Sequence, residues 1–135
     1  MTSWYAAMND RWPRSLWEVS ERMRAGAAFD PTYREFLDFF YANPAARTEA
    51  LARCPAALDP LPDAYLAATA EHLARVFELP IPEWSETHGQ GLTRPFFAGG
   101  LESLKGILTV ESPLAFRRRL IFISKNALSR PRLSP

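Results

Sequence analysis

The stretch LPDAYLAATAEHLARVFE, residues 61–78, decides the fold of this chain. Its apolar residues, together with Thr69, recur at steps of three and four, the period of one face of an α-helix. They are Leu61, Tyr65, Leu66, Thr69, Leu73, Val76 and Phe77. Because Pro80 and Pro82 prevent the helix from continuing, the pattern predicts a central helix over residues 61–78.

Capping signals predict two helices before this segment. Ser15 and Glu18 have the spacing of a capping box, and the helix that they open should end near Gly26. Asp30 followed by Pro31 is typical of an N-cap and a first helical position, and the helix that follows carries a dense aromatic face. This second helix is therefore expected to be buried.

Proline also predicts the breaks between the remaining elements. Pro44 should end the aromatic helix and start another that runs to about residue 53, and Pro113 should start the last helix. A further helix is expected over residues 101–108 after a loop over residues 85–95. Residues 120–124 include two β-branched isoleucines and favour a short extended piece.

Length and composition indicate one globular domain. The chain has 135 residues, of which 47% are hydrophobic and 23% charged, a balance outside the range of disordered chains. We predict an all-α fold, a single compact domain of five to seven helices with at most a short β element near residues 120–124. Residues 1–29 would form an N-terminal helical extension, residues 30–128 the helical core domain and residues 129–135 a tail. The predicted core contains Phe36, Phe40, Leu66, Leu73, Phe77 and Trp84.

The expected compartment is the cytoplasm. Cys54 is the only cysteine, so no internal disulfide framework is possible. The N-terminal region has no apolar run of signal-peptide length, and no apolar stretch is long enough to span a bilayer. We therefore expect no membrane partner.

The sequence offers little support for catalysis or cofactor binding. Cys54, His72 and His88 share no metal-type spacing, and the glycines near residues 90 and 100 lack the lysine and hydroxyl of a nucleotide-binding loop. We predict no catalytic residue, cofactor or metal. The alternative is a small enzyme whose site lies in the loop over residues 84–95, where His88 occurs among acidic residues.

The basic C-terminal end is the main functional signal. Six basic residues and no acidic residue follow Ser112, whereas the whole chain has a net charge of only +1. This asymmetry indicates a partner with a negative surface, either an acidic protein or a nucleic acid. The predicted partner-binding residues are Arg117, Arg118, Arg119, Lys125 and Arg130. Three adjacent arginines on a helix point in different directions, so a carboxylate inside the fold could instead anchor part of the cluster.

Several segments together resemble a known family. They are YLAATAEHLA at residues 65–74, LPIPEW at 79–84, RPFF at 94–97 and ESPLAFRRRLIFI at 111–123. This combination resembles a poorly characterised family of small bacterial proteins, whose domain often follows an N-terminal helix-turn-helix and is encoded beside a nucleotidyltransferase-like protein. The resemblance covers roughly residues 30–128 and implies an antitoxin-like role. The residues before Asp30 leave room for one helix only, so the chain departs here from the longer members.

The resemblance and the charge asymmetry lead to one functional prediction with two alternatives. We expect a non-enzymatic, antitoxin-like protein that neutralises a nucleotidyltransferase-type toxin through its basic C-terminal surface. The first alternative is a nucleic-acid-binding regulatory module that uses the same arginines on phosphates. The second is the small enzyme described above.

Overall fold

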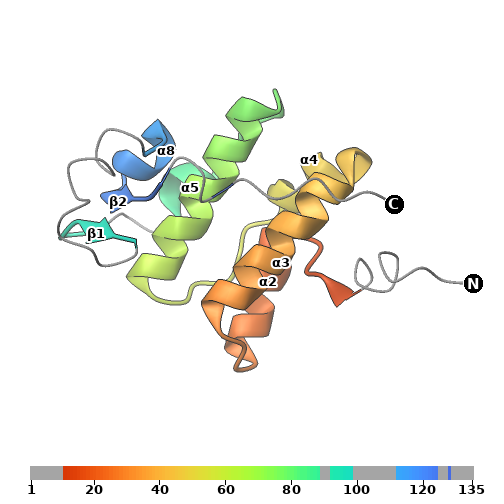
Figure 1. Ribbon diagram of the computed structural model, residues 1–135, viewed down its shortest axis with the longest axis horizontal. Coiled ribbons are helices and arrows are strands. Elements are labelled where there is room, and N and C mark those ends of the chain that lie inside the picture. Colours follow the sequence, from red (N-terminus) through yellow and green to blue (C-terminus); the bar gives the residue numbers. More distant parts are fainter. Residues whose placement is uncertain (1–10, 89–91, 99–111, 125–127, 129–135) are drawn as a thin grey trace, which may run out of the picture. The chain divides into compact units, whose positions relative to one another are not determined.

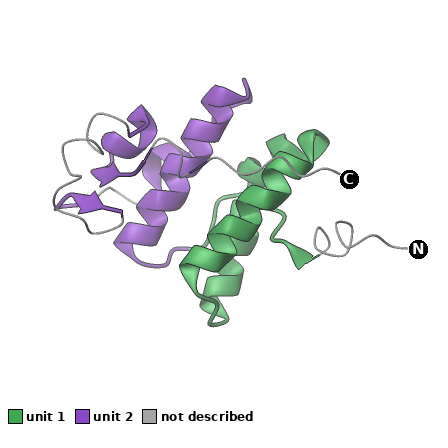
Figure 2. Cartoon of the chain, in the orientation of Figure 1, with its two compact units in different colours: residues 1–56, 130–135 green, residues 57–129 purple. Residues whose placement is uncertain are grey.

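The structure, a computed structural model, describes residues 11–88, 92–98, 112–124 and 128. The chain divides into two compact units, residues 1–56 with 130–135 and residues 57–129 (Figure 2). The described part of both units is mostly helical, and its β-structure is a single pair of two-residue strands (Figure 1). The predicted all-α class is therefore confirmed. The division differs from the predicted domain boundaries at residues 29/30 and 128/129, which stay a prediction.

The first unit begins with α2 (Leu16–Arg24), whose start follows the predicted capping box. The Ser15 hydroxyl accepts a hydrogen bond from the Glu18 amide at 3.0 Å and so satisfies an amide that has no partner within the helix. The chain leaves the helix at Gly26, whose φ of 109° favours glycine.

The aromatic helix α3 (Phe29–Ala42) starts earlier than expected. Ala28, in an extended conformation, is its N-cap and makes no side-chain capping bond, so the prediction of Asp30 as the N-cap is wrong. Pro31 still lies in the first turn, where its missing amide proton has no helical partner to lose. The aromatic face is buried as predicted, with Phe36 and Phe40 both at 0% exposure.

Two short helical segments complete this unit. They are the 3₁₀-helix η1 (Pro44–Ala46) and α4 (Arg47–Ala52). The Arg47 side chain donates to the carbonyls of Phe40 and Tyr41 at 3.0 and 3.1 Å, and so caps the C-terminal end of α3.

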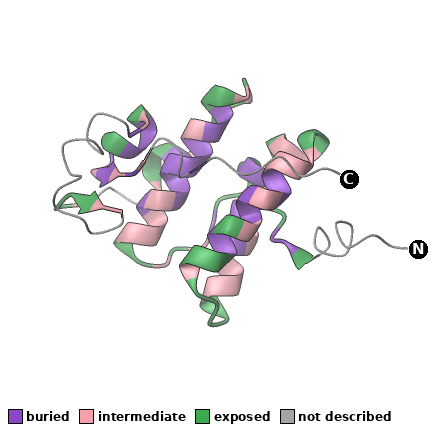
Figure 3. Ribbon diagram, viewed as in Figure 1, coloured by how far each residue is buried: buried purple, intermediate pink, exposed green. Residues whose placement is uncertain are grey.

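The second unit is built on the predicted central helix, α5 (Pro60–Val76). Figure 3 shows its middle buried, and Leu66 and Leu73 are both at 0% exposure. The helix ends where Glu78 adopts a left-handed φ of 56° and the Leu79 amide donates to the Ala74 carbonyl at 2.8 Å. Phe77 and Trp84, also predicted as core, are half-buried.

Short elements follow α5 in the described part of this unit, and the helices among them pack against it. They are α6 (Trp84–Thr87), β1 (Phe96–Phe97), α8 (Leu114–Arg117) and β2 (Ile121–Phe122). The extended segment predicted within residues 120–124 is confirmed as β2. Its parallel partner β1, which pairs Phe96 with Ile121, was not predicted. The helix expected over residues 101–108 lies outside the described residues.

Two contacts fix α8 and the segment that follows it. The Phe116 ring, fully buried, lies edge-on to Tyr65 and His72 of α5, at centroid distances of 5.3 and 6.2 Å. The buried Ser112 hydroxyl accepts from the Ile123 amide at 2.8 Å and donates to the Ile123 carbonyl at 2.9 Å. The arginine cluster is thereby held beside α5.

Candidate interaction surface around the C-terminal arginines

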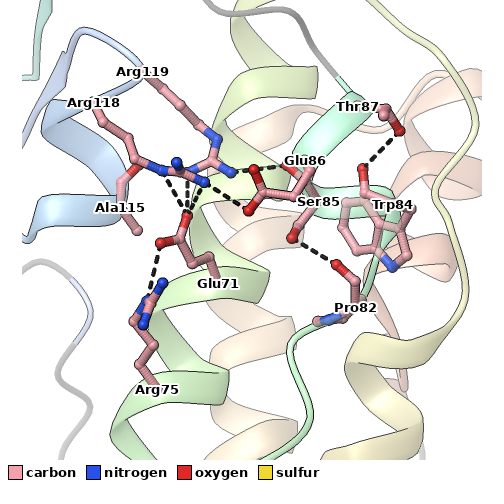
Figure 4. A network of polar contacts seen from close by, with 10 residues as sticks. All are labelled: Glu71, Arg75, Pro82, Trp84, Ser85, Glu86, Thr87, Ala115, Arg118 and Arg119. Atoms are coloured by element: carbon pink, nitrogen blue, oxygen red, sulfur yellow. Dashed lines mark hydrogen bonds and ion pairs between the residues drawn. The ribbon is translucent and has the colours of Figure 1, made fainter.

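A buried carboxylate, Glu71 of α5, lies at the centre of the arginine cluster (Figure 4). Its side chain is 1% exposed. One oxygen, Oε1, accepts from Arg119 Nη1 at 2.7 Å and from Arg118 Nε at 2.9 Å. The other, Oε2, accepts from Arg75 Nε, one helical turn further along α5, at 3.0 Å. Three guanidinium groups therefore share one carboxylate.

The charge of Glu71 is maintained by these donors. Burial alone would raise the pKa of its carboxyl group, but hydrogen bonds from Arg119, Arg75 and Arg118 outweigh burial and leave the pKa below its ordinary value. The side chain is therefore a carboxylate at neutral pH. A buried carboxylate needs such partners, because an unpaired charge in the interior is strongly unfavourable.

Arg119 belongs to the interior of the unit. Besides Glu71, its guanidinium donates to the carbonyls of Ala115 and Ser85, at 2.7 and 2.8 Å. These bonds tie α5, α6 and α8 together, and the side chain is 8% exposed. Arg119 is therefore an internal anchor, the alternative role considered for part of the cluster, and we remove it from the predicted partner-binding surface.

Arg118 is positioned from inside and reaches the surface. Its Nη2 donates to Glu86 of α6 at 2.9 Å, while its Nε donates to Glu71. The side chain is 40% exposed, and that of Glu86 is 57% exposed. Burial lowers the pKa of Arg118, but the two carboxylates have the larger combined effect and raise it.

Of the other predicted partner-binding residues, one is exposed and two lie outside the described part of the chain. Arg117 is exposed on α8. Lys125 and Arg130 lie outside the described residues. Leu114, at 61% exposure, is separated from Arg117 and Arg118 by three and four positions, so the three share one side of this helical turn. We call Leu114, Arg117 and Arg118 the outer face of α8.

Sequence reasoning missed the role of Glu71. Glu71 is not among the residues whose period predicts the central helix. A signal was present, because alanines occupy positions 64, 67 and 68, which precede Glu71 on the same helical face by seven, four and three residues. Small side chains along one helical face are typical of a face on which another segment packs closely.

The alternative enzymatic site of residues 84–95 brings different groups together. The Ser85 hydroxyl is buried and donates to the Pro82 carbonyl at 2.7 Å. His88 Nε2 lies 3.5 Å from Asp63 Oδ1 at the start of α5. His72 lies instead against Phe116, and its burial lowers its pKa, partly offset by Glu71. Residues 84–88 thus contact Arg119 through the Ser85 carbonyl and Arg118 through Glu86. His72 takes no part in these contacts.

In the part of the chain that the structure describes, no three side chains of His, Cys, Asp or Glu are grouped so that they could hold a metal ion. None of the helices among these residues is both long and apolar enough to cross a membrane. Comparison with models of protein families, with curated proteins and with solved structures found no match. The family resemblance therefore stays a prediction.

Proposed function

We propose that this chain is a non-enzymatic binding protein of the antitoxin type, which contacts an acidic protein partner through the outer face of α8. The family resemblance suggests a nucleotidyltransferase-like toxin as that partner. The observation that supports the proposal is the mixed character of this face, in which exposed Leu114 lies beside the exposed Arg117 and the partly exposed Arg118. Arginines beside an apolar anchor are typical of the residues that dominate protein interfaces.

The buried contacts that fix α8 also support a role in binding. Arg119 ties the end of α8 to α5 through its bond of 2.7 Å to Glu71, and it also donates to the main-chain carbonyls of Ala115 and Ser85 at 2.7 and 2.8 Å. The outer arginines are therefore presented by a fixed backbone, which reduces the ordering cost of association. A nucleic-acid partner is less favoured, because the chain as a whole is nearly neutral, with a net charge of +1.

The test is a binding measurement with the protein encoded beside this gene, which the family resemblance implies is nucleotidyltransferase-like. Arg117→Glu should weaken the complex by at least about tenfold, because a like charge then faces the acidic partner. The matched control is Arg94→Glu, which reverses another exposed arginine of the same unit outside α8. Both variants should melt at the wild-type temperature, because exposed charges contribute little to stability.

Two results would contradict the proposal. One is the absence of any complex between the two purified proteins, and the other is an equal effect of both charge reversals. Tight retention of DNA or RNA by this chain alone, with a steep salt dependence, would favour the nucleic-acid alternative instead.

A further inference from the structure

Arg118 contacts two carboxylates that differ sharply in their surroundings. Glu71, which accepts from its Nε at 2.9 Å, has a side chain that is 1% exposed. Glu86, which accepts from its Nη2 at 2.9 Å, has a side chain that is 57% exposed. The inner carboxylate is fixed in the interior, whereas the outer one lies on the surface in a short helix.

This difference makes the outer contact the exchangeable one. An exposed ion pair contributes little to stability, because water screens its charges and two long side chains lose freedom when they pair. Glu86 can therefore move away at small cost. Glu71 continues to hold the Arg118 guanidinium in place when this happens, because the Glu71 side chain is itself buried and is also bound by the buried Arg119.

We infer that Glu86 occupies the position of a partner's carboxylate. This inference rests on the proposed function and names the chemistry of its site: an Asp or Glu side chain of an acidic protein replaces Glu86 on Arg118, next to Arg117. The exchange substitutes one carboxylate for another, so the guanidinium keeps its geometry and its charge-assisted hydrogen bond. Glu86 consequently acts as an internal competitor that lowers the affinity for acidic segments.

The charge of the site supports a carboxylate as the ligand. The three guanidiniums of Arg75, Arg118 and Arg119 face the two carboxylates of Glu71 and Glu86. Displacement of Glu86 leaves a net charge of +2 on this group, which a single incoming carboxylate reduces to the present value of +1. The incoming carboxylate therefore restores the net charge that this group of side chains has before the exchange.

The experiment uses a hexaglutamate peptide as the probe and a matched pair of variants. Glu86→Ala removes the competitor, and Glu83→Ala removes another exposed acidic residue, which precedes Glu86 by three positions. At low ionic strength, Glu86→Ala should bind the peptide about two- to fivefold more tightly than the wild type, the range expected for an exposed ion pair. Glu83→Ala should produce a clearly smaller gain.

A nuclear magnetic resonance titration locates the binding. The Nε–H signal of Arg118 should shift on addition of the peptide to Glu86→Ala, whereas that of buried Arg119 should change little. Equal gains in both variants would show general electrostatic attraction and overturn the inference. So would the absence of peptide binding to Glu86→Ala, or an unchanged Arg118 signal.

Failure of this inference and failure of the proposed function are distinguishable. A complex with the nucleotidyltransferase-like protein that weakens in Arg117→Glu but keeps its affinity in Glu86→Ala would support the proposed function and overturn the exchange. Peptide binding that improves in Glu86→Ala, without any complex with that protein, would support the exchange and contradict the proposed function.

Discussion

Substitution of the buried carboxylate tests the central feature of the second unit. Glu71→Gln keeps the shape of the side chain and removes its charge. The Arg119 guanidinium, with only 8% of its side chain exposed, then remains buried without a carboxylate, because the glutamine amide oxygen and the Ala115 and Ser85 carbonyls that can accept from it are all uncharged. Loss of one member of a buried ion pair costs about 3–5 kcal/mol, because the other charge remains in the interior.

This loss is large relative to the stability of a small protein. A typical free energy of unfolding is about 5–15 kcal/mol, so Glu71→Gln should be strongly destabilised in urea denaturation at pH 7. The control is Glu86→Ala, which removes the exposed carboxylate of the same network and should cost less than about 1 kcal/mol. A loss below about 1 kcal/mol in Glu71→Gln would refute the assignment of Glu71 as the anchor.

The pH dependence of the unfolding free energy provides a second comparison between the wild type and Glu71→Gln. The pKa of Glu71 is lowered in the folded chain from an ordinary value of 4.5, so its contribution is fully present above that value. The contribution decreases as the pH falls through the lowered pKa, because the folded state must then take up a proton. The difference in unfolding free energy between wild type and Glu71→Gln should therefore narrow below about pH 4.5. A constant difference down to complete acid unfolding would contradict the ion-pair explanation.

Four further variants test other parts of the structure by urea denaturation. Leu73→Ala should lose about 2–5 kcal/mol, because it leaves a cavity at a fully buried position, and a loss under about half a kcal/mol would show a misplaced core. Ser112→Ala should lose about 1–3 kcal/mol, because Ile123 loses a buried partner for both its amide and its carbonyl; an unchanged stability would contradict this role. Glu78→Gly should instead gain about 0.5–1 kcal/mol, because glycine adopts the left-handed φ of 56° without strain, and a loss would count against the helix end described above. Wild-type stability should fall as the pH drops below 6.5, because burial lowers the pKa of His72 and the unfolded chain binds the proton first; His72→Gln should reduce this slope, and an unchanged slope would assign it to other groups.

Local signals in the sequence predicted the helices that depend on neighbouring residues. The capping box at Ser15 works as expected because its donor and acceptor are three residues apart. The bounds of α5 agree with the predicted helix within about two residues, because proline is accepted in the first helical turn and Pro80 and Pro82 exclude a continuation through them. The N-cap of α3 was misplaced by two residues. The capping preference of Asp30 does not by itself determine where a helix begins.

The arrangement of the arginine cluster was predicted only in part. The charge asymmetry identified the arginine cluster, and the opposed directions of adjacent helical residues indicated that some of its members could point inward. Which member does so could not be decided locally, because the acceptor of Arg119 lies 48 residues away on α5. The pairing of Phe96 with Ile121 was missed for the same reason, since two-residue strands carry no period of their own.

The sequence by itself determined the helical class, the positions of most helix ends and the concentration of positive charge after Ser112. These properties depend on backbone geometry, capping groups and composition, all of which act over a few residues. Only the tertiary structure decided that Glu71 is an internal anchor, that Arg119 is buried against it and that Arg117 remains outside. The reason is that the state of a charge depends on the water and the opposite charges around it, and folding brings those together from distant parts of the chain.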